Sequence, residues 1–406
     1  MLFFCAVGMT MIIYSPYILS NAQIGLLVLA LFDVQLSPFK LGLHPKLKEN
    51  WFGFWSTPVF WVPSLMLFLV LVGFLYSTDI NYGFERLVLK LPFLGLPFAF
   101  YCLPRLSKRA YMGLFYFLIV LLFISNIGIG IHYLHHFDAI NEGLIYGRPI
   151  PTPRNHVRYS LLLNLAIVAG AILLYSRYYF VKSSEKWLIL FITLFNFGFL
   201  HVLAVRSGLL ILYISLVLGV LSLIFLQKKF FLGIGLGAII VLIPIIAYQT
   251  IPSFQTKISY ATWEYKELLS DRVVSGSDNG RIHSLQVGWA LFKAHPLIGV
   301  GAGDLRKEVH AKYTQMYPEK SQSLMPHNQF LSVAAGSGML GLLIFIVAFF
   351  YPLLANKNFK DPFFLMLFFT FFLSFMVENT LENSIGIGFF CLFLCMGLSF
   401  LTRLKD

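Results

Sequence analysis

The stretch AYMGLFYFLIVLLFISNIGIGI at 110–131 contains no charged side chain. An α-helix needs about 20 apolar residues to cross the hydrocarbon core of a bilayer, so this stretch predicts a transmembrane helix. Comparable runs recur along the whole chain. The sequence therefore predicts an all-α polytopic membrane protein with about 12 transmembrane helices, at 2–15, 18–34, 57–76, 86–102, 110–131, 158–176, 186–204, 207–226, 230–248, 329–354, 362–378 and 384–402.

The composition agrees with this fold class. Of the 406 residues, 58% are hydrophobic and 12% are charged, whereas a soluble domain carries about 25% charged residues. So little charge excludes a soluble globular enzyme, a disordered protein and a secreted disulfide scaffold. The net charge of +12 indicates the positive-inside bias and contact with anionic membrane lipids, or a basic site for an anionic lipid-linked substrate, and no nucleic-acid partner is expected.

The basic residues predict the orientation of the chain. With the N-terminus in the cytoplasm, the short outer segments 77–84 and 379–383 contain no Lys or Arg. The first span lacks the basic n-region and cleavage site of a signal peptide, and is expected to remain a helix. Each of the six segments that would then lie inside contains two or three basic residues: Lys40, Lys46, Lys48; Arg105, Lys108, Arg109; Arg177, Lys182, Lys186; Lys228, Lys229; Lys357, Lys360; and Arg403, Lys405. Both termini are therefore predicted to be cytoplasmic.

The spans divide the chain into three parts. Residues 1–248 hold about nine transmembrane helices, 249–328 form one long outer loop, and 329–406 hold three more transmembrane helices. Apolar residues at helical spacing predict amphipathic helices within the loop. These helices are expected at 256–270, 281–293 and 304–317, and HPLIGVGAGDL at 295–305 is expected to be a turn.

Two arginines on the outer side are candidate phosphate ligands. Arg206 lies at the outer mouth of a span, where a charge is costly unless it reaches the headgroups or binds a ligand in a cavity. Arg281 opens a predicted amphipathic helix, which is an unfavourable place for a cation unless it has another task. The alternatives are a snorkelling side chain for Arg206, and for Arg281 a solvated side chain or an ion pair with Asp278.

His327 is the candidate general base. It follows Pro326, which interrupts the preceding segment, and it precedes Asn328, a residue type that caps helices well. His327 is thus expected where the long loop re-enters the membrane. An imidazole can accept a proton near neutral pH, although a single histidine is more often structural.

Two further groups lie at the same outer surface. Arg154, His156 and Arg158 precede or begin one span. Glu378 and Glu382 flank the turn between the last two spans, where they could orient a base or pair with an arginine. The alternative for both groups is anchoring at the membrane interface.

Motifs of metal and nucleotide chemistry do not occur in the sequence: HExxH, a Cys/His cluster, GxxxxGK[ST] and GxSxG are all missing. No metal and no cofactor are therefore expected. The charged candidates gather at the outer surface and not along a transmembrane path, which argues against a channel or transporter.

These residues resemble the O-antigen ligase and O-antigen polymerase family. The resemblance covers about 203–350, and the catalytic region that it predicts extends over about 203–390. It rests on Arg206-Ser207-Gly208, GRIHSLQVGWALFKAHPLIGVGAGDL at 280–305, PHNQFLSVAAGSGMLGLLIF at 326–345, and the tail VENTLENSIGIGFF at 377–390.

The resemblance implies an inverting, metal-independent glycosyltransferase with a GT-C-like fold. Such an enzyme sits in the bacterial inner membrane and takes a glycan from undecaprenyl diphosphate at the periplasmic face. It attaches that glycan to a lipid A–core acceptor. By position, Arg206 and Arg281 would bind the diphosphate and His327 would act on the acceptor hydroxyl. Arg158, His156, Asn328, Glu378 and Glu382 would support them.

Two alternatives to a ligase stay open. The first is a relative with the same chemistry, namely a polysaccharide polymerase or a protein O-oligosaccharyltransferase. The second is a flippase or transporter of lipid-linked glycan, which would need no catalytic base. The single dominant outer loop, without an added soluble domain, favours the ligase slightly.

Overall fold

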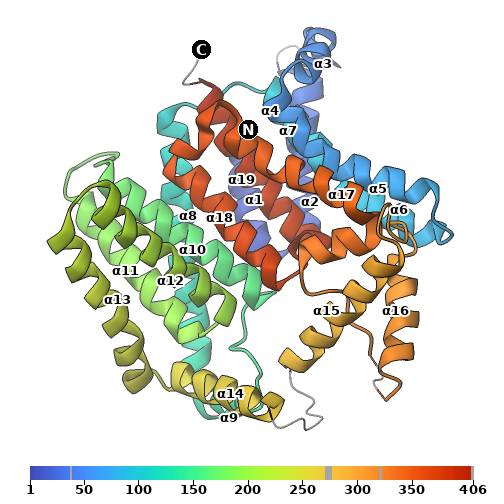
Figure 1. Ribbon diagram of the computed structural model, residues 1–406. Coiled ribbons are helices and arrows are strands. Elements are labelled where there is room, and N and C mark those ends of the chain that lie inside the picture. Colours follow the sequence, from blue (N-terminus) through green and yellow to red (C-terminus); the bar gives the residue numbers. More distant parts are fainter. Residues whose placement is uncertain (37–38, 270–276, 320–321, 404–406) are drawn as a thin grey trace. The chain divides into compact units, whose positions relative to one another are not determined.

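The computed structural model describes residues 1–36, 39–269, 277–319 and 322–403 (Figure 1). The chain forms two compact units, which we call unit 1 (residues 1–114 and 280–406) and unit 2 (residues 115–279). The chain is 81% helical, and the strands of the described part form one hairpin. The predicted all-α class is therefore confirmed.

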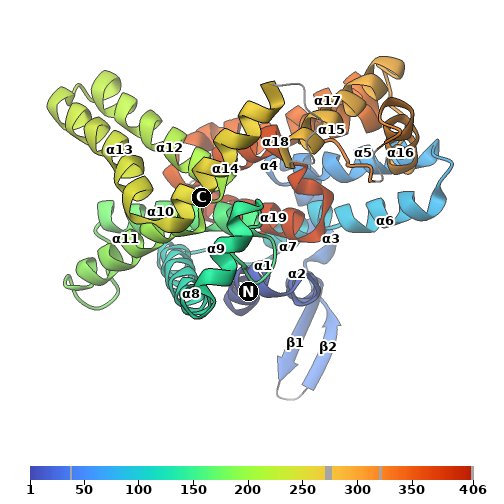
Figure 2. The same cartoon turned by 90° about the horizontal axis from the view of Figure 1, so that it is seen from below.

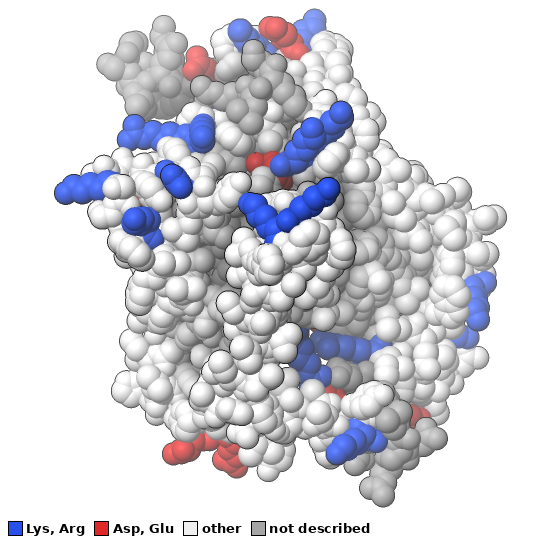
Figure 3. All heavy atoms as spheres, turned by 60° about the vertical axis from the view of Figure 1, so that its left-hand side comes forward, with Lys and Arg blue, Asp and Glu red and all other residues white. Residues whose placement is uncertain are grey.

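In the part of the chain that the structure describes, eight helical segments are long and apolar enough to cross a membrane: Pro58–Leu75, Lys108–His135, His156–Tyr175, Glu185–Leu203, Arg206–Phe225, Phe230–Thr250, Gln329–Lys360 and Ser384–Thr402. Shorter apolar helices are α1 (Leu2–Tyr14), α2 (Pro16–Leu31) and α18 (Pro362–Val377). Most of the surface in Figure 3 carries neither Lys, Arg, Asp nor Glu. The chain is thus a multi-helix membrane protein, and the number of twelve spans stays a prediction.

The span expected at 86–102 is not one helix. The structure divides this region into α6 (Ile80–Lys90) and α7 (Pro92–Cys102). Pro92 causes the division, because proline has no N–H for a helix interior and is well suited to the first turn of a new helix. Asp79 caps the start of α6 by accepting a hydrogen bond of 3.0 Å from the Tyr82 amide.

The expected span 18–34 is also shorter than predicted. Helix α2 ends at Leu31, and β1 (Phe32–Leu36) pairs antiparallel with β2 (Phe39–Leu43). This hairpin projects away from the helices around it (Figure 2). Alternating apolar and polar residues in FDVQL are a strand pattern at the end of an apolar run. After the hairpin come α3 (Leu47–Trp55), α4 (Pro58–Trp61), η1 (Val62–Ser64) and α5 (Leu65–Leu75).

An aromatic core holds the last helices of unit 1 together. Helix α17 (Gln329–Leu354) continues through η3 (Ala355–Lys360) to α18, and η4 (Thr380–Glu382) leads to α19 (Ser384–Arg403). The rings of Phe349 and Phe375 lie 5.0 Å apart, and those of Phe371 and Phe390 lie 4.9 Å apart. All four side chains are fully buried. This packing fixes where α17 begins and where α18 ends.

Helices α15 (Ser277–Ala294) and α16 (Leu305–Met316) confirm two of the helices expected in the long loop. The predicted turn between them packs against α17, where Val300 and Gly301 donate to the carbonyls of Ala335 and Gly336 at 3.0 and 2.9 Å. Gly338 of α17 has a φ of +66°, and a Cβ there would lie 2.2 Å from the Leu297 backbone. Glycine is therefore required at this contact.

Unit 2 is built from the rest of α8 (Lys108–His135), α9 (Phe137–Ile145), α10 (His156–Tyr175), α11 (Glu185–Leu203), α12 (Arg206–Leu221), η2 (Ser222–Leu226), α13 (Phe230–Thr250) and α14 (Pro252–Leu269). Helix α14 corresponds to the helix expected at 256–270, of which residue 270 lies outside the described residues. Only 11% of the residues in the most apolar part of α13 are buried within the protein, as expected for a helix surrounded by lipid. Helix α9, which packs on α14, was not predicted.

Candidate functional site

The start of α17 is fixed by Asn328. Its Oδ1 accepts a hydrogen bond of 2.9 Å from the Leu331 amide, and its Nδ2 donates to the Met376 carbonyl of α18 at 3.1 Å. The first bond confirms the predicted helix cap. The second ties the start of α17 to the end of α18, so the residue before Asn328 has a defined position.

That residue is His327, which is half-buried. Its Nδ1 lies 3.0 Å from the Met325 carbonyl oxygen. A carbonyl oxygen only accepts, so Nδ1 carries the proton in this bond and Nε2 keeps its lone pair. No described residue forms a hydrogen bond with Nε2 that would occupy this lone pair. The tautomer is the one that a general base acting through Nε2 requires.

Ser284 of α15 connects His327 to the helix that carries Arg281. The Ser284 hydroxyl donates to the Arg281 carbonyl at 2.7 Å, and its oxygen accepts from the His327 amide at 3.2 Å. The same oxygen lies 3.4 Å from His327 Nδ1. Ser284 was not singled out in the sequence, because a serine within an amphipathic helix has no distinctive pattern.

Arg281 lies one helical turn before Ser284. Its NH2 group is 3.1 Å from Glu378 Oε1 at the end of α18, with 38% of the arginine side chain and 17% of the glutamate side chain exposed. An arginine partner was one of the roles expected for Glu378, and Arg281 is that partner. Arg281 does not open the helix as expected, since α15 begins at Ser277. The side chain of Asp278, the alternative partner, lies outside the described residues.

Glu382 lies on the other side of the α17 start. It accepts a hydrogen bond of 2.8 Å from Gln329 Nε2 and forms ion pairs with Lys90 at 3.1 Å and Arg86 at 3.6 Å. Burial alone would raise the pKa of Glu382, but Lys90, Gln329 and Arg86 together lower it below its ordinary value. Glu382 is therefore an ionised anchor for α17, and its basic partners on α6 were not recognised in the sequence.

A second arginine–glutamate pair lies in unit 2. Arg206 is the first residue of α12, and its NH2 group is 3.0 Å from Oε2 of Glu264, whose side chain is only 6% exposed. The guanidinium also lies 5.7 Å from the centre of the Tyr260 ring. Glu264 and Tyr260 both belong to α14, so this loop helix covers the start of α12.

Lys257 of α14 adds a further positive charge near this pair. Its Nζ donates to the carbonyls of Gly147 and Arg148 at 2.8 and 2.7 Å. Burial, together with the positive charge of Arg206, lowers the pKa of Lys257 to about 8, although Glu264 acts in the opposite direction. Neither Lys257 nor Glu264 was a sequence candidate.

The other candidates of unit 2 lie at helix ends. His156 and Arg158 are half-buried in the first turn of α10, where Asn155 caps the helix by accepting from the Arg158 amide at 3.0 Å. Arg154 precedes this turn and is exposed. The arrangement of all three fits a helix start and does not by itself assign them a chemical role.

The structure thus brings Arg281, His327, Asn328 and Glu378 together in unit 1, with Glu382 anchoring the same helix. Arg206, His156 and Arg158 belong to unit 2. Within the part of the chain that is described, no three His, Cys, Asp or Glu side chains are grouped in a way that could hold a metal ion. The unit 1 cluster combines a guanidinium group, held by Glu378, with an imidazole whose Nε2 keeps its lone pair.

Residues 188–346 match the family model described as O-antigen ligase, and this match confirms the resemblance drawn from the sequence. The matched segment contains Arg206, Arg281 and His327, and it ends before Glu378 and Glu382. A search of curated proteins finds no match. The family match supports a membrane enzyme of the O-antigen ligase and polymerase type that acts on lipid-linked glycan.

Proposed function

We propose that this protein is an O-antigen ligase of the bacterial inner membrane. It transfers a glycan from undecaprenyl diphosphate to a hydroxyl of lipid A–core, without a metal or cofactor. The family match supports the reaction class. The observation that carries the proposal is the hydrogen bond from His327 Nδ1 to the Met325 carbonyl, since it leaves Nε2 as an acceptor. Ser284 connects this histidine to the helix that carries Arg281.

In the proposed reaction, His327 Nε2 takes the proton of the acceptor hydroxyl. The acceptor oxygen attacks the anomeric carbon of the glycan from the side opposite the diphosphate. The bond from that carbon to the diphosphate oxygen breaks as the new glycosidic bond forms, so the anomeric centre is inverted. A positioned base contributes about 10²- to 10⁴-fold to the rate, and positioning of the two lipid-bound substrates contributes the rest.

The leaving diphosphate gains negative charge that must be stabilised. Arg281 and Arg206 are the proposed ligands, because a guanidinium donates two parallel hydrogen bonds to a phosphoryl group. Glu378 holds the Arg281 guanidinium in place, and Ser284 and Asn328 position His327. Arg158 and His156 are proposed to support donor binding, and Glu382 to support the start of α17.

We propose that the chain is organised in the membrane in three parts. Transmembrane helices occupy 1–248 and 329–406, the loop 249–328 lies in the periplasm, and the catalytic region extends over 203–390. Both termini lie in the cytoplasm. The active site therefore faces the periplasm, where both lipid-linked substrates would present their sugars.

The test is the product formed by the purified full-length protein from a lipid-diphosphate-linked glycan. One reaction receives lipid A–core, a second receives only more donor, and a third receives an acceptor protein. A ligase extends lipid A–core and leaves the other two mixtures unchanged. Longer glycan on the donor lipid would identify a polymerase, and glycosylated protein would identify an oligosaccharyltransferase; either product contradicts the ligase proposal.

A further inference from the structure

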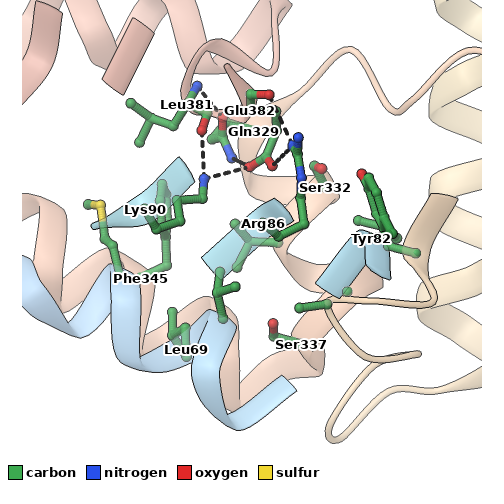
Figure 4. Close-up of a pocket in the computed structure, with 16 residues that line it drawn as sticks. Leu69, Tyr82, Arg86, Lys90, Gln329, Ser332, Ser337, Phe345, Leu381 and Glu382 are labelled. Carbon is green, nitrogen blue, oxygen red and sulfur yellow. Dashed lines mark hydrogen bonds and ion pairs between the residues drawn. The ribbon is translucent and has the colours of Figure 1, made fainter. Parts of the chain in front are cut away.

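A cavity within unit 1 lies between α5, α6, α17 and η4 (Figure 4). Its volume is about 60 Å³. A buried water needs about 10–15 Å³, so the cavity has room for a group of several heavy atoms. It is large enough for a single phosphoryl group, and it is separate from the contacts of His327 described above.

The two walls of the cavity differ in chemistry. Helix α6 contributes Arg86 and Lys90, which point toward Glu382 (Figure 4). The rest of the lining is mainly apolar and includes Leu69 of α5 and Phe345 of α17, while Ser332 and Ser337 of α17 add hydroxyl groups. A ligand that fills this space therefore combines an anionic group with hydrocarbon.

The charged wall has an excess of positive charge. Among the described residues that line the cavity, Glu382 is the one carboxylate, and it faces two cations, at 3.1 Å from Lys90 and 3.6 Å from Arg86. Asp304 lies close in the chain to the lining residue Leu305, but its carboxylate accepts hydrogen bonds from the Thr78 and Asp79 amides at 2.7 and 2.9 Å. It does not neutralise the second cation.

Arg86 has a buried donor that remains unused. Its Nε is inaccessible to solvent and has no hydrogen-bond partner among the described residues. Buried donors normally have partners, and one that lacks a partner needs an explanation. A third cation lies nearby, because the guanidinium groups of Arg86 and Arg306 lie 4.9 and 4.3 Å from the centre of the Tyr82 ring.

We infer that this cavity binds the phosphoryl headgroup of a membrane lipid. Arg86 and Lys90 hold the phosphate oxygens by charge-assisted hydrogen bonds. Ser332 and Ser337 of α17 provide hydroxyl groups that line the cavity. An acyl chain of the lipid runs along Leu69 and Phe345. The bound lipid joins α6 to the start of α17 through Glu382 and Gln329. This inference goes beyond the proposed transfer reaction and does not depend on it.

The experiment measures lipid binding to the purified full-length protein in detergent by native mass spectrometry. The probe is phosphatidic acid, with diacylglycerol and inorganic phosphate in separate titrations. We expect phosphatidic acid to bind, and Arg86→Gln to weaken that binding by about tenfold or more. Arg86→Lys, which keeps the charge but loses the planar fork, should show an intermediate loss.

Lys312→Gln removes one charge from α16 in the same unit, away from the cavity, and should leave the affinity unchanged. The thermal transition of each variant without lipid shows whether it is folded, and Glu382 keeps Lys90 as a partner in Arg86→Gln. Equal affinity of phosphatidic acid for the wild type and Arg86→Gln would overturn the inference. Binding of diacylglycerol or inorganic phosphate as tight as that of phosphatidic acid would also overturn it.

Discussion

The arginine–glutamate pairs of the two units have nearly the same geometry and different surroundings. Arg281–Glu378 spans 3.1 Å and Arg206–Glu264 spans 3.0 Å, and the arginine side chains are 38% and 37% exposed. Ser284 links the first pair to His327. Beside the second pair lie Tyr260 and Lys257.

The difference separates two kinds of task. A half-exposed guanidinium held by one carboxylate is suited to bind an anion at either position. The unit 1 pair is connected through Ser284 to His327, whose tautomer leaves Nε2 as an acceptor. We therefore propose that His327 of unit 1 carries out proton transfer and that both arginines stabilise charge.

The largest effect is expected from His327→Ala. Loss of the base should reduce glycan transfer by about 10²- to 10⁴-fold, measured as the initial rate with purified protein. His310→Ala removes an exposed histidine of α16 and serves as the matched control, which should retain the wild-type rate. Full transfer by His327→Ala would contradict a catalytic base at this position.

Arg281→Lys and Arg206→Lys compare the two arginines directly. Each lysine keeps the charge and loses the fork that binds two phosphate oxygens, so each variant should lose about 10- to 100-fold in transfer. The exposed Arg109→Lys, on the predicted cytoplasmic side, should retain the wild-type rate. Near-normal turnover by either variant would remove that arginine from the proposed diphosphate site.

Stability should distinguish the two pairs in a different way. Arg206→Gln removes the ion pair of 3.0 Å with the buried carboxylate of Glu264, at a cost of roughly 1–3 kcal/mol, and should lower the thermal transition more than Arg281→Gln does. The double variant Arg206→Gln/Glu264→Gln should recover part of the loss. Equal transitions for the two single variants would show that the burial of Glu264 has no energetic consequence.

The smallest effect concerns Lys257. Its pKa is lowered to about 8 from the ordinary 10.5, so between these values the unfolded chain binds a proton that the folded protein has released. Folding stability should therefore rise with pH over this window through Lys257. Reductive methylation, followed by peptide mass spectrometry, should give half-maximal reaction of Lys257 near pH 8. Arg206→Gln should move this midpoint to higher pH, because it removes the positive charge that lowers the pKa of Lys257. An unchanged midpoint would contradict a repulsion between Arg206 and Lys257.

Features that depend on local sequence were predictable. Runs of uncharged residues predicted the long helices, and Asn328 predicted the start of α17. Apolar residues at helical spacing predicted α15 and α16. The same local logic made Glu378 a candidate partner of an arginine, and it pairs with Arg281. The placement of Arg206, Arg281 and His327 at an outer surface stays a prediction. Pro92 is the local signal for the division of 86–102 into two helices. Most of this stretch is apolar, however, so it was predicted to be a single transmembrane helix.

Features that depend on long-range contacts were not predictable. Ser284 acquires its role from a residue 43 positions away, and Glu264 from one 58 positions away. The partners of Glu382 on α6 are more than 290 positions away in the chain. A single sequence gives no signal for such pairs, because side-chain type alone does not reveal which distant element packs beside it.

The most direct test of the account is the affinity of the purified variants for glycan-free undecaprenyl diphosphate. If His327 acts on the acceptor and Arg281 on the diphosphate, His327→Ala should bind this lipid as tightly as the wild type. Arg281→Gln should bind it at least about tenfold more weakly. Wild-type affinity in Arg281→Gln, or loss of binding in His327→Ala, would contradict the division of tasks between these two residues.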